Sequence, residues 1–255
     1  MTMTSHSQQD PGRLTVNEPV LTVEHRDRVA WLRLNRPRAA NALNESLHQA
    51  LISALSDAQA RPSVTAVVLC ASGGRVFSAG ADLKEFAELD GLVARRRRRA
   101  LLRDTLLAFC DFGKPVVACV EGKAIGAGAM LALIADQCLL ESQATLSMPE
   151  IGLGSASPMA VSVVMGRAGR DVAIRMVQAG EVIDARTAVD LRLADQVVEA
   201  PGLEPEADRM AVRLGSVSLR AYRQNRRWIY RNLRSEIIEA AGEFSNWIDQ
   251  DNQGA

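Results

Sequence analysis

Apolar positions along the chain gather in short segments that predict β-strands. Segments 20–23 and 29–34 are rich in valine and leucine and flank the polar pair 26–27, so we expect an opening hairpin. Segments 66–70 and 115–120 are continuous apolar runs, the pattern of strands that are buried on both faces. A further strand is expected at 137–141.

Between these strands the apolar positions recur at helical spacing. From about Asn44 they predict a helix that Pro62 closes. A long helix is expected around the arginines at 95–99, and a short, fully apolar helix after the glycines at 126–128. From about Ala185 the pattern becomes helical, and it includes two or three amphipathic segments between Glu204 and Trp247.

The alternation of strands and helices predicts an α/β fold, with a parallel or mixed sheet and helices packed outside it. We divide the chain into a polar N-terminal tail at 1–18 that we expect to be disordered, a core over 19–200, and a helical C-terminal region over 201–255. The tail has no apolar segment of the signal-peptide kind. The longest apolar run, 124–135, is too short to span a bilayer.

Composition and charge limit the expected partners. The 255 residues are 47% hydrophobic and 24% charged, which is typical of a soluble globular protein. Lys plus Arg and Asp plus Glu each total 30, so the net charge points to no nucleic-acid and no membrane partner. The four cysteines are scattered and form no ligand pattern with the three histidines. We therefore expect no metal, buried reduced thiols and a cytoplasmic location.

Two loops of small residues are candidate anion sites. Segment 77–84 reads Phe-Ser-Ala-Gly-Ala-Asp-Leu-Lys, and segment 125–128 reads Ile-Gly-Ala-Gly. Small side chains let a ligand approach free N–H groups at a helix start. If the loops converge, the N–H groups of Ala81 and Ala127 would point at one oxygen and form an oxyanion hole. Each loop alone fits a tight turn under a helix equally well. A dinucleotide site is disfavoured, because Leu131 stands where the third glycine belongs.

Among the charged residues, Glu150 in segment 148–154 is the acid that we expect to react. Asp82 and Asp136 are expected to cap helices instead. The arginines at 95–99 cannot all face one way on a helix, so most should be solvated, with one or two able to reach phosphates. The histidines lie outside these motifs and are not expected to be catalytic: they are His6, His25 and His48.

Taken together, the motifs resemble those of the enoyl-CoA hydratase/isomerase (crotonase) family in order and spacing, from about Val20 to Val198. The segments that carry the resemblance are 35–37, 41–43, 77–84, 114–118, 126–128 and 149–154, extended by 168–170, 180–185 and 188–195. The resemblance implies a crotonase-like spiral of ββα units with a helical C-terminal trimerisation region. It also implies a homotrimer or homohexamer.

The resemblance implies an acyl-CoA substrate, in which CoA is part of the substrate, and no separate cofactor. The N–H groups of Ala81 and Ala127 would hold the thioester oxygen and stabilise an enolate, and Glu150 would be the acid/base. Arg38 and Lys84 sit where relatives place basic groups near the CoA phosphates, and the adenine would pack against 79–83. The implied substrate-binding residues are Arg38, Ala79, Gly80, Asp82, Leu83, Lys84, Gly126 and Met130.

Three departures from the family pattern bear on the reaction. Hydratases of the family carry a first glutamate where this chain has Met130, whereas the second glutamate is retained as Glu150. The usual glycine-rich stretch reads Ser-Ala-Ser-Pro-Met-Ala-Val at 155–161, which alters the wall near the acyl group. The sequence stops at 251–255, roughly where relatives begin a last basic-aromatic helix, so the resemblance is not used to assign the CoA or subunit contacts of that helix.

A single carboxylate favours proton transfer over water addition. Moving a double bond from the 3,4 to the 2,3 position needs one base, whereas hydration is easiest with two carboxylates. The sequence therefore predicts isomerisation of 3-enoyl-CoA to 2-enoyl-CoA by Glu150. The alternatives are a 2-enoyl-CoA hydratase of low or narrow activity and a non-catalytic acyl-CoA-binding protein.

Overall fold

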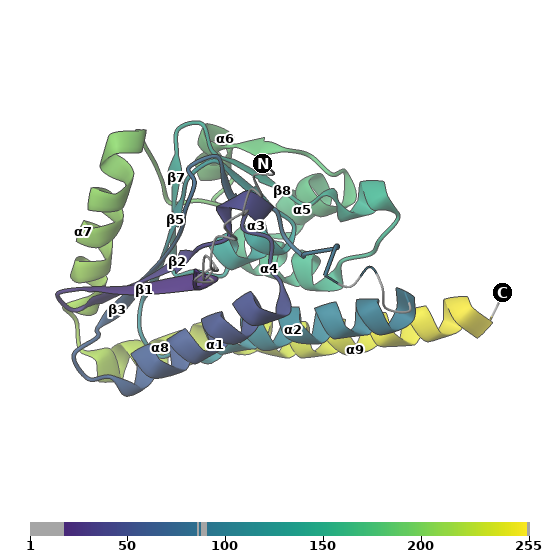
Figure 1. Cartoon of the computed structure of the whole chain (residues 1–255), viewed down its shortest axis with the longest axis horizontal. Helices are drawn as coiled ribbons and strands as arrows, with labels where there is room; N and C mark the ends of the chain where they lie inside the picture. Colours follow the sequence, from purple (N-terminus) through teal and green to yellow (C-terminus); the bar gives the residue numbers. More distant parts are fainter. Residues whose placement is uncertain (1–17, 86, 88–90, 254–255) are drawn as a thin grey trace, which may run out of the picture.

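Three consecutive ββα units form the centre of the molecule (Figure 1). The computed structural model describes residues 18–85, 87 and 91–253, with side chains described up to residue 243. The predicted tail at 1–18 lies outside these residues except for Glu18. In each unit the first strand joins a large sheet, the second joins a small sheet, and a helix follows. The units are β3 (Ala66–Ala71), β4 (Val76–Ser78) and α2 (Gly91–Asp111); β5 (Val116–Val120), β6 (Lys123–Ile125) and α3 (Ala127–Leu133); and β7 (Gln137–Glu141), β8 (Thr145–Ser147) and α4 (Pro158–Ala168).

The large sheet has the strand order β1-β2-β3-β5-β7-β10. The hairpin predicted at the start of the chain is confirmed, because β1 (Leu21–Arg26) pairs antiparallel with β2 (Val29–Leu34). All later pairs in this sheet are parallel, and the last strand is β10 (Gln196–Val198). The small sheet has the order β4-β6-β8-β9, in which the three ββα strands run parallel and β9 (Ile183–Asp184) pairs antiparallel.

Both faces of the large sheet are buried, as the continuous apolar runs predict. Side chains alternate between the two faces of a strand. In β3, Val67 and Leu69 face the main core, whereas Val68 and Cys70 face a second cluster. The helix α7 (Leu203–Gly215) covers that second cluster (Figure 1). The first helix of the predicted helical C-terminal region over 201–255 therefore completes the core of the large sheet.

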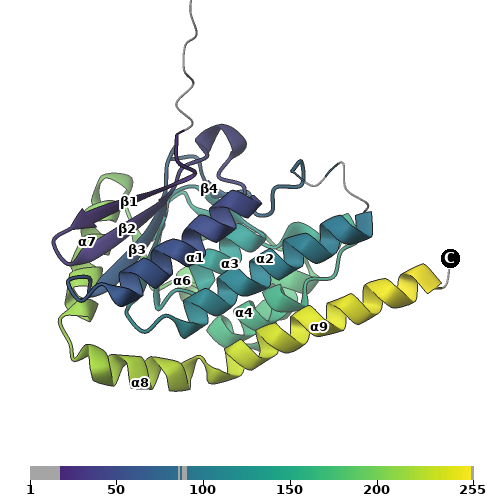
Figure 2. The same ribbon diagram turned by 60° about the horizontal axis from the view of Figure 1, so that its bottom comes forward.

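Helices α1 (Glu45–Ala60), α2 and α9 (Arg231–Gln253) lie along the other side of the molecule (Figure 2). The start of α1 is confirmed at Asn44, whose side chain accepts the Leu47 N–H at 3.0 Å as an N-cap. Helix α9 packs against α2 and α4, and α8 (Leu219–Ile229) precedes it. The remaining short elements are η1 (Pro37–Ala39), η2 (Pro149–Leu153), α5 (Arg170–Ala173), η3 (Ile174–Gln178), α6 (Ala185–Asp190) and η4 (Ala200–Gly202).

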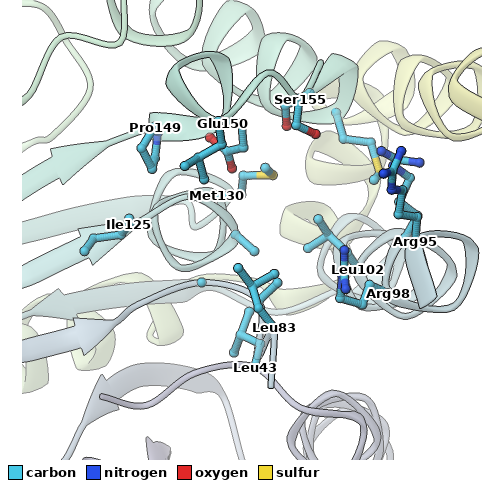
Figure 3. A pocket seen from close by; sticks show the side chains of 18 of the residues that line it. Leu43, Leu83, Arg95, Arg98, Leu102, Ile125, Met130, Pro149, Glu150 and Ser155 are labelled. Carbon is cyan, nitrogen blue, oxygen red and sulfur yellow. The ribbon is translucent and has the colours of Figure 1, made fainter. Parts of the chain in front are cut away.

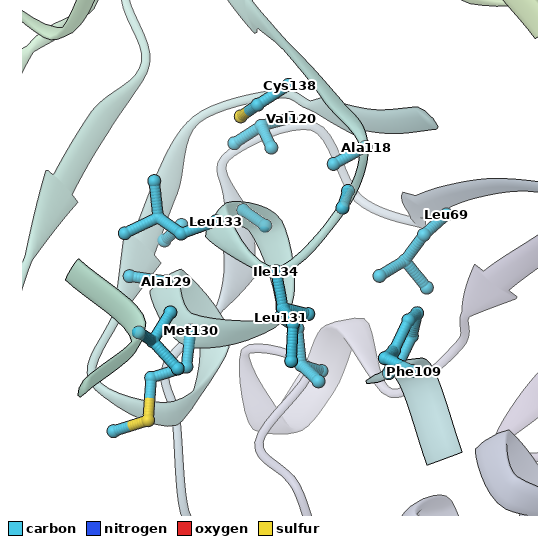
Figure 4. Close-up of a cluster of buried hydrophobic side chains, with 14 of the residues drawn as sticks. Leu69, Phe109, Ala118, Val120, Ala129, Met130, Leu131, Leu133, Ile134 and Cys138 are labelled. Atoms are coloured by element: carbon cyan, nitrogen blue, oxygen red, sulfur yellow. The ribbon is translucent and has the colours of Figure 1, made fainter. Parts of the chain in front are cut away.

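Helix α3 lies inside the molecule, and all seven of its residues are buried. A helix that is apolar on every side belongs in a core. Figure 4 shows Met130 projecting on the opposite side of α3 from Cys138 and Val120. The four cysteines are free and buried, as expected. Within the described part of the chain, no helix is long and apolar enough to cross a membrane.

Candidate active site

The three sequence motifs meet because each follows one of the parallel strands of the small sheet. Strand β4 leads into 79–81, β6 leads into Gly126 and Ala127, and β8 leads into Pro149 and Glu150. The carboxyl ends of neighbouring parallel strands lie at one edge of a sheet, which is where α/β proteins bind ligands. Short parallel strands thus bring together loops that are up to about 70 residues apart in the sequence.

The loop after β4 holds the N–H of Ala81 in a defined direction. Ala81 forms a parallel bridge with Leu43, in which Leu43 N–H donates to Gly80 O at 2.7 Å and Asp82 N–H donates to Leu43 O at 3.0 Å. In an extended chain, the N–H of a residue points opposite to the C=O of the residue before it and to the N–H of the residue after it. The N–H of Ala81 therefore points away from Leu43.

A buried asparagine holds the loop after β4 in place through hydrogen bonds. Asn41 is fully buried, and its side chain donates to Ser72 O and Val76 O at 2.9 Å each while accepting the Arg36 N–H. Ser78 Oγ donates to Asn41 O at 2.8 Å. These hydrogen bonds hold segments 35–43 and 72–78 together. Both segments include residues of the motifs that carry the family resemblance.

The second N–H comes from the start of α3. Gly80 packs against this point so closely that a Cβ added to it would meet Ile125 O at 2.8 Å and Ala127 N at 3.3 Å. Gly126 is the N-cap of α3 with φ of +52°, and Ala127 is the first helical residue, whose N–H has no partner inside the helix. Among the described residues, neither Ala81 N–H nor Ala127 N–H donates to another backbone group. The two loops converge, as an oxyanion hole requires.

Glu150 lies in the first turn of η2, directly against this loop. A Cβ added to Gly126 would meet Glu150 Oε1 at 2.7 Å, so the carboxyl touches the residue before the Ala127 N–H. Glu150 Oε2 is buried and has no hydrogen-bond partner among the described residues. Burial raises the pKa of Glu150 above its ordinary value. An unpartnered buried carboxyl of this kind is suited to exchanging a proton with a ligand.

A cavity of about 530 Å³ opens in front of these groups (Figure 3). Its lining includes eight of the predicted site residues, which are Ala79, Gly80, Ala81, Leu83, Gly126, Ala127, Met130 and Glu150. The altered wall predicted after the second motif also lines it, through 155–159. Arg38, Asp82 and Lys84 do not line the cavity. The predicted contacts of Arg38 and Lys84 with CoA phosphates stay predictions.

The two aspartates expected to cap helices do not do so. Asp82 pairs with Arg36 at 2.9 Å and accepts the Lys84 N–H at 3.2 Å within a turn. Asp136 accepts the Val116 N–H at 2.8 Å and pairs with the buried Arg226 at 2.9 Å. Both predictions were wrong because no helix begins at either residue: a turn follows Asp82 at 83–85, and strand β7 follows Asp136.

Two further groups line the cavity although no motif contained them. Arg95, Arg98 and Arg99 line it from α2. The expectation that most of the five arginines are solvated is confirmed, because Arg95, Arg96 and Arg97 are exposed, whereas Arg98 and Arg99 are half-buried. His48 lines it from α1 and is buried. The helical repeat that places Leu47, Leu51 and Leu55 inward also carries His48 inward, which is a sequence signal for its burial.

His48 has a fixed tautomer. Thr105 Oγ1 donates to Leu101 O at 2.9 Å, so it accepts from His48 Nδ1, which lies 2.7 Å away. The proton therefore sits on Nδ1. Burial lowers the pKa of His48 to about 4, and the ring is neutral at pH 7.

Comparison with known proteins agrees with this geometry. The family model for enoyl-CoA hydratase/isomerase matches residues 24–246. A probable enoyl-CoA hydratase of Mycobacterium leprae is 32% identical over 228 residues, covering 86% of this chain and 84% of the relative. The 2,3-dehydroadipyl-CoA hydratase of Escherichia coli is 38% identical over 178 residues, covering 69% and 68%.

Solved structures agree as well. A crystal structure of an enoyl-CoA hydratase/isomerase from Xanthobacter autotrophicus matches with a TM-score of 0.80 and 27% identity, covering 89% of this chain and 85% of that one. An enoyl-CoA hydratase from Bacillus anthracis matches with a TM-score of 0.79 and 26% identity, covering 88% and 90%. The expected ββα spiral is confirmed. The chain belongs to the enoyl-CoA hydratase/isomerase family, whose enzymes act on acyl-CoA thioesters.

Proposed function

We propose that the protein converts a 3-enoyl-CoA thioester to the 2-enoyl-CoA, with Glu150 as the single acid/base. One observation carries this proposal. Glu150 is the only carboxylate among the described residues that line the cavity. Met130, at the position of the first glutamate of hydratases in this family, is 1% exposed and lines the same cavity. Its thioether cannot hold or deprotonate water.

In this reaction the base acts twice. Glu150 removes a proton from C2, and the electron pair moves into the thioester to give an enolate conjugated with the 3,4 double bond. The N–H groups of Ala81 and Ala127 stabilise the negative oxygen. The protonated Glu150 then delivers the same proton to C4, which leaves a double bond between C2 and C3 and re-forms the thioester carbonyl. No water enters the products.

The environment of Glu150 supports both halves of this cycle. Burial raises its pKa, so the free energy difference between its protonated and ionised forms near neutral pH is smaller than for an exposed glutamate. A group that must accept a proton and then return it works best when neither form is strongly favoured. The apolar Met130 and the buried Oε2 of Glu150 keep the carboxyl in this state.

A hydratase of low or narrow activity is the second candidate, and the names of relatives favour it. The relatives from Mycobacterium leprae and Escherichia coli both carry hydratase names. Water addition at this site would need a second group to orient the water. His48 is a neutral, proton-accepting side chain on the cavity wall. In a hydratase, it is the side chain available to orient the water.

The substitution Glu150→Gln tests the proposal. It keeps the size of the side chain and removes the base, so turnover of 3-enoyl-CoA should fall by about 10²–10⁴-fold. Binding of a saturated acyl-CoA, measured by calorimetry, should stay within severalfold. A variant that retains full isomerisation activity would reject Glu150 as the base. If the wild-type protein binds acyl-CoA but converts neither enoyl isomer, the result favours the alternative of a non-catalytic acyl-CoA-binding protein.

We also propose a homotrimer or homohexamer. Trp228 and Ile229 at the end of α8 are 68% and 72% exposed, which is unusual for such large apolar side chains and supports a partner at this end of the helix. Sedimentation equilibrium at micromolar concentration should give three or six times the 27.6 kDa of one chain. A single-chain mass would contradict the proposal.

A further inference from the structure

His48 joins two of the helices that line the cavity. It lies on α1 next to Leu47 and one turn before Leu51, on the side of the helix that is buried, and only 3% of the residue is exposed. Its Nδ1 lies 2.7 Å from Oγ1 of Thr105 on α2, and Thr105 is fully buried. The imidazole ring is therefore held in one orientation between α1 and α2.

The other ring nitrogen, Nε2, is open to the cavity. Because Thr105 holds the proton on Nδ1, Nε2 has a free lone pair and can only accept a hydrogen bond. In the part of the chain that the structure describes, no group donates to Nε2, and the atom is not enclosed by protein. Since His48 lines the cavity, the group that reaches Nε2 belongs to a molecule inside the cavity.

The surroundings of Nε2 make this acceptor costly to leave unpaired. Leu43, Leu101 and Leu102 also line the cavity, and they offer no side-chain donor. A ligand that fills the cavity displaces water from its walls. An acceptor that loses water and gains no other donor weakens the complex. Tight binding therefore requires that the ligand itself bring a donor to Nε2.

We propose that the cavity recognises an N–H or O–H group of its ligand through Nε2 of His48, which makes His48 a ligand-binding residue. This rests on the proposed function only in that an acyl-CoA thioester binds in the cavity, and it does not require isomerisation. Such a thioester offers donors of this kind in two places. The pantetheine arm of CoA has amide N–H groups, and an acyl chain can carry a hydroxyl group. Both would make the same hydrogen bond to Nε2, so a comparison of ligands decides between them.

The test uses saturated thioesters, which bind without reacting, and calorimetry on the wild-type protein and on His48→Phe. Phenylalanine keeps an aromatic ring and removes the acceptor. The ligands are a straight-chain acyl-CoA, analogues in which one pantetheine amide N–H is replaced by CH₂, and forms of the acyl-CoA with one hydroxyl group at successive carbons beyond C4.

The two sources of the donor predict different results. If a pantetheine amide is the donor, replacing its N–H should weaken binding to the wild type about tenfold and change binding to His48→Phe within about twofold. If an acyl hydroxyl is the donor, adding it at the fitting carbon should strengthen binding to the wild type about tenfold and again leave His48→Phe within about twofold. If both proteins give the same ratios of affinity for all of these ligands, the proposal is wrong.

Another histidine of this chain provides the control. His25 on β1 is exposed and does not line the cavity. The substitution His25→Phe makes the same chemical change, and it should leave the wild-type affinity ratios unchanged. If His25→Phe removes the preference as His48→Phe does, the effect does not arise from a contact in the cavity, and the proposal is overturned.

Nitrogen NMR of the wild-type protein tests the same claim without relying on the folding of a variant. The spectrum of ring-labelled histidine distinguishes a protonated from an unprotonated ring nitrogen. His48 is recognised because burial lowers its pKa to about 4, so its ring stays neutral where an exposed histidine is charged. We expect the proton on Nδ1, and a shift of the Nε2 signal when the tighter-binding thioester is added. A proton on Nε2, or an Nε2 signal that the ligand leaves unchanged, would overturn the proposal. Because none of these ligands reacts, absence of isomerase turnover would count against the proposed function alone.

Discussion

The acid/base role that we propose for Glu150 depends on how little water reaches its carboxyl. The structure places Oε2 in a buried position without a protein partner, and burial raises the pKa above that of an exposed glutamate. The base is active only when it is ionised. Its activity is therefore present above the raised pKa and is lost as the pH falls through it.

This argument predicts the acid limb of the pH profile. The value of kcat/KM for isomerisation should fall on the acid side with a midpoint above the pKa of an exposed glutamate, because the free enzyme must carry Glu150 as the carboxylate. Stopped assays across the acid range on folded protein measure this midpoint. A rate that stays constant down to the pKa of an exposed glutamate would show that Glu150 is not the titrating base.

Gly126 should be needed for activity more than for folding. Its φ of +52° disfavours any other residue, and a Cβ there would press on Glu150 Oε1 at 2.7 Å. We expect Gly126→Ala to lower kcat about ten- to a hundredfold, because small displacements of a catalytic group cost that much. Gly169→Ala is the matched control, with φ of +89° and open space around the added methyl group. Equal kcat values for both variants would show that this contact does not position Glu150.

At the level of single residues, the sequence predicts the site best where a motif of fixed order and spacing supplies the group. Ala81, Ala127 and Glu150 could be placed because their motifs have fixed order and spacing, and their loops converge as expected. His48 could not be placed at the cavity, because its position depends on which helix packs against Thr105. For Asp136, no pattern in the sequence indicates that its partner is Arg226, 90 residues later.

At the level of elements, Arg226 of α8 joins parts of the core that are distant in sequence. Its side chain is 2% exposed, and Nη1 donates to Phe109 O at 2.8 Å and Phe112 O at 2.6 Å at the end of α2. Nε pairs with Asp136 at 2.9 Å, in the turn between α3 and β7. A cation at a helix C-terminus also interacts favourably with the helix dipole.

Removing this cation should destabilise the fold. Arg226→Met leaves Asp136 and the last carbonyl groups of α2 without their partner, so the free energy of unfolding should fall by about 3–5 kcal/mol. Urea denaturation measures the change. The exposed neighbour Arg227 provides the control, since Arg227→Met should change stability by less than about 0.5 kcal/mol. Similar small losses for both variants would mean that the buried ion pair contributes no net stability.

The strands of the large sheet and the small sheet differ in how far the sequence predicts them. Strands β3 and β5 are continuous apolar runs and were predicted within one residue. Strands β4, β6 and β8 have three residues each, which is too short for a recognisable period. Yet these short strands set the site, because they align the three loops that carry the chemistry.

At the level of the whole molecule, the cavity is assembled from segments that span most of the chain. Loops after the strands of the small sheet supply Ala81, Ala127 and Glu150, α1 and α2 supply His48 and three arginines, and α9 contributes Ala240. Contacts between segments this distant leave no local sequence signal. The resemblance to a family predicts the reacting centre, whereas the far wall of the cavity follows only from the packing of α2 and α9 in this chain.

The central claim is that one carboxylate makes this site an isomerase. The most direct test compares initial rates of the wild-type protein on matched 3-enoyl-CoA and 2-enoyl-CoA substrates, with Met130→Glu measured beside it on folded protein. We predict that the wild type isomerises the 3-enoyl substrate faster than it hydrates the 2-enoyl substrate, and that Met130→Glu raises hydration relative to isomerisation, since a carboxylate there can hold water opposite Glu150. Faster hydration than isomerisation by the wild type would contradict the account.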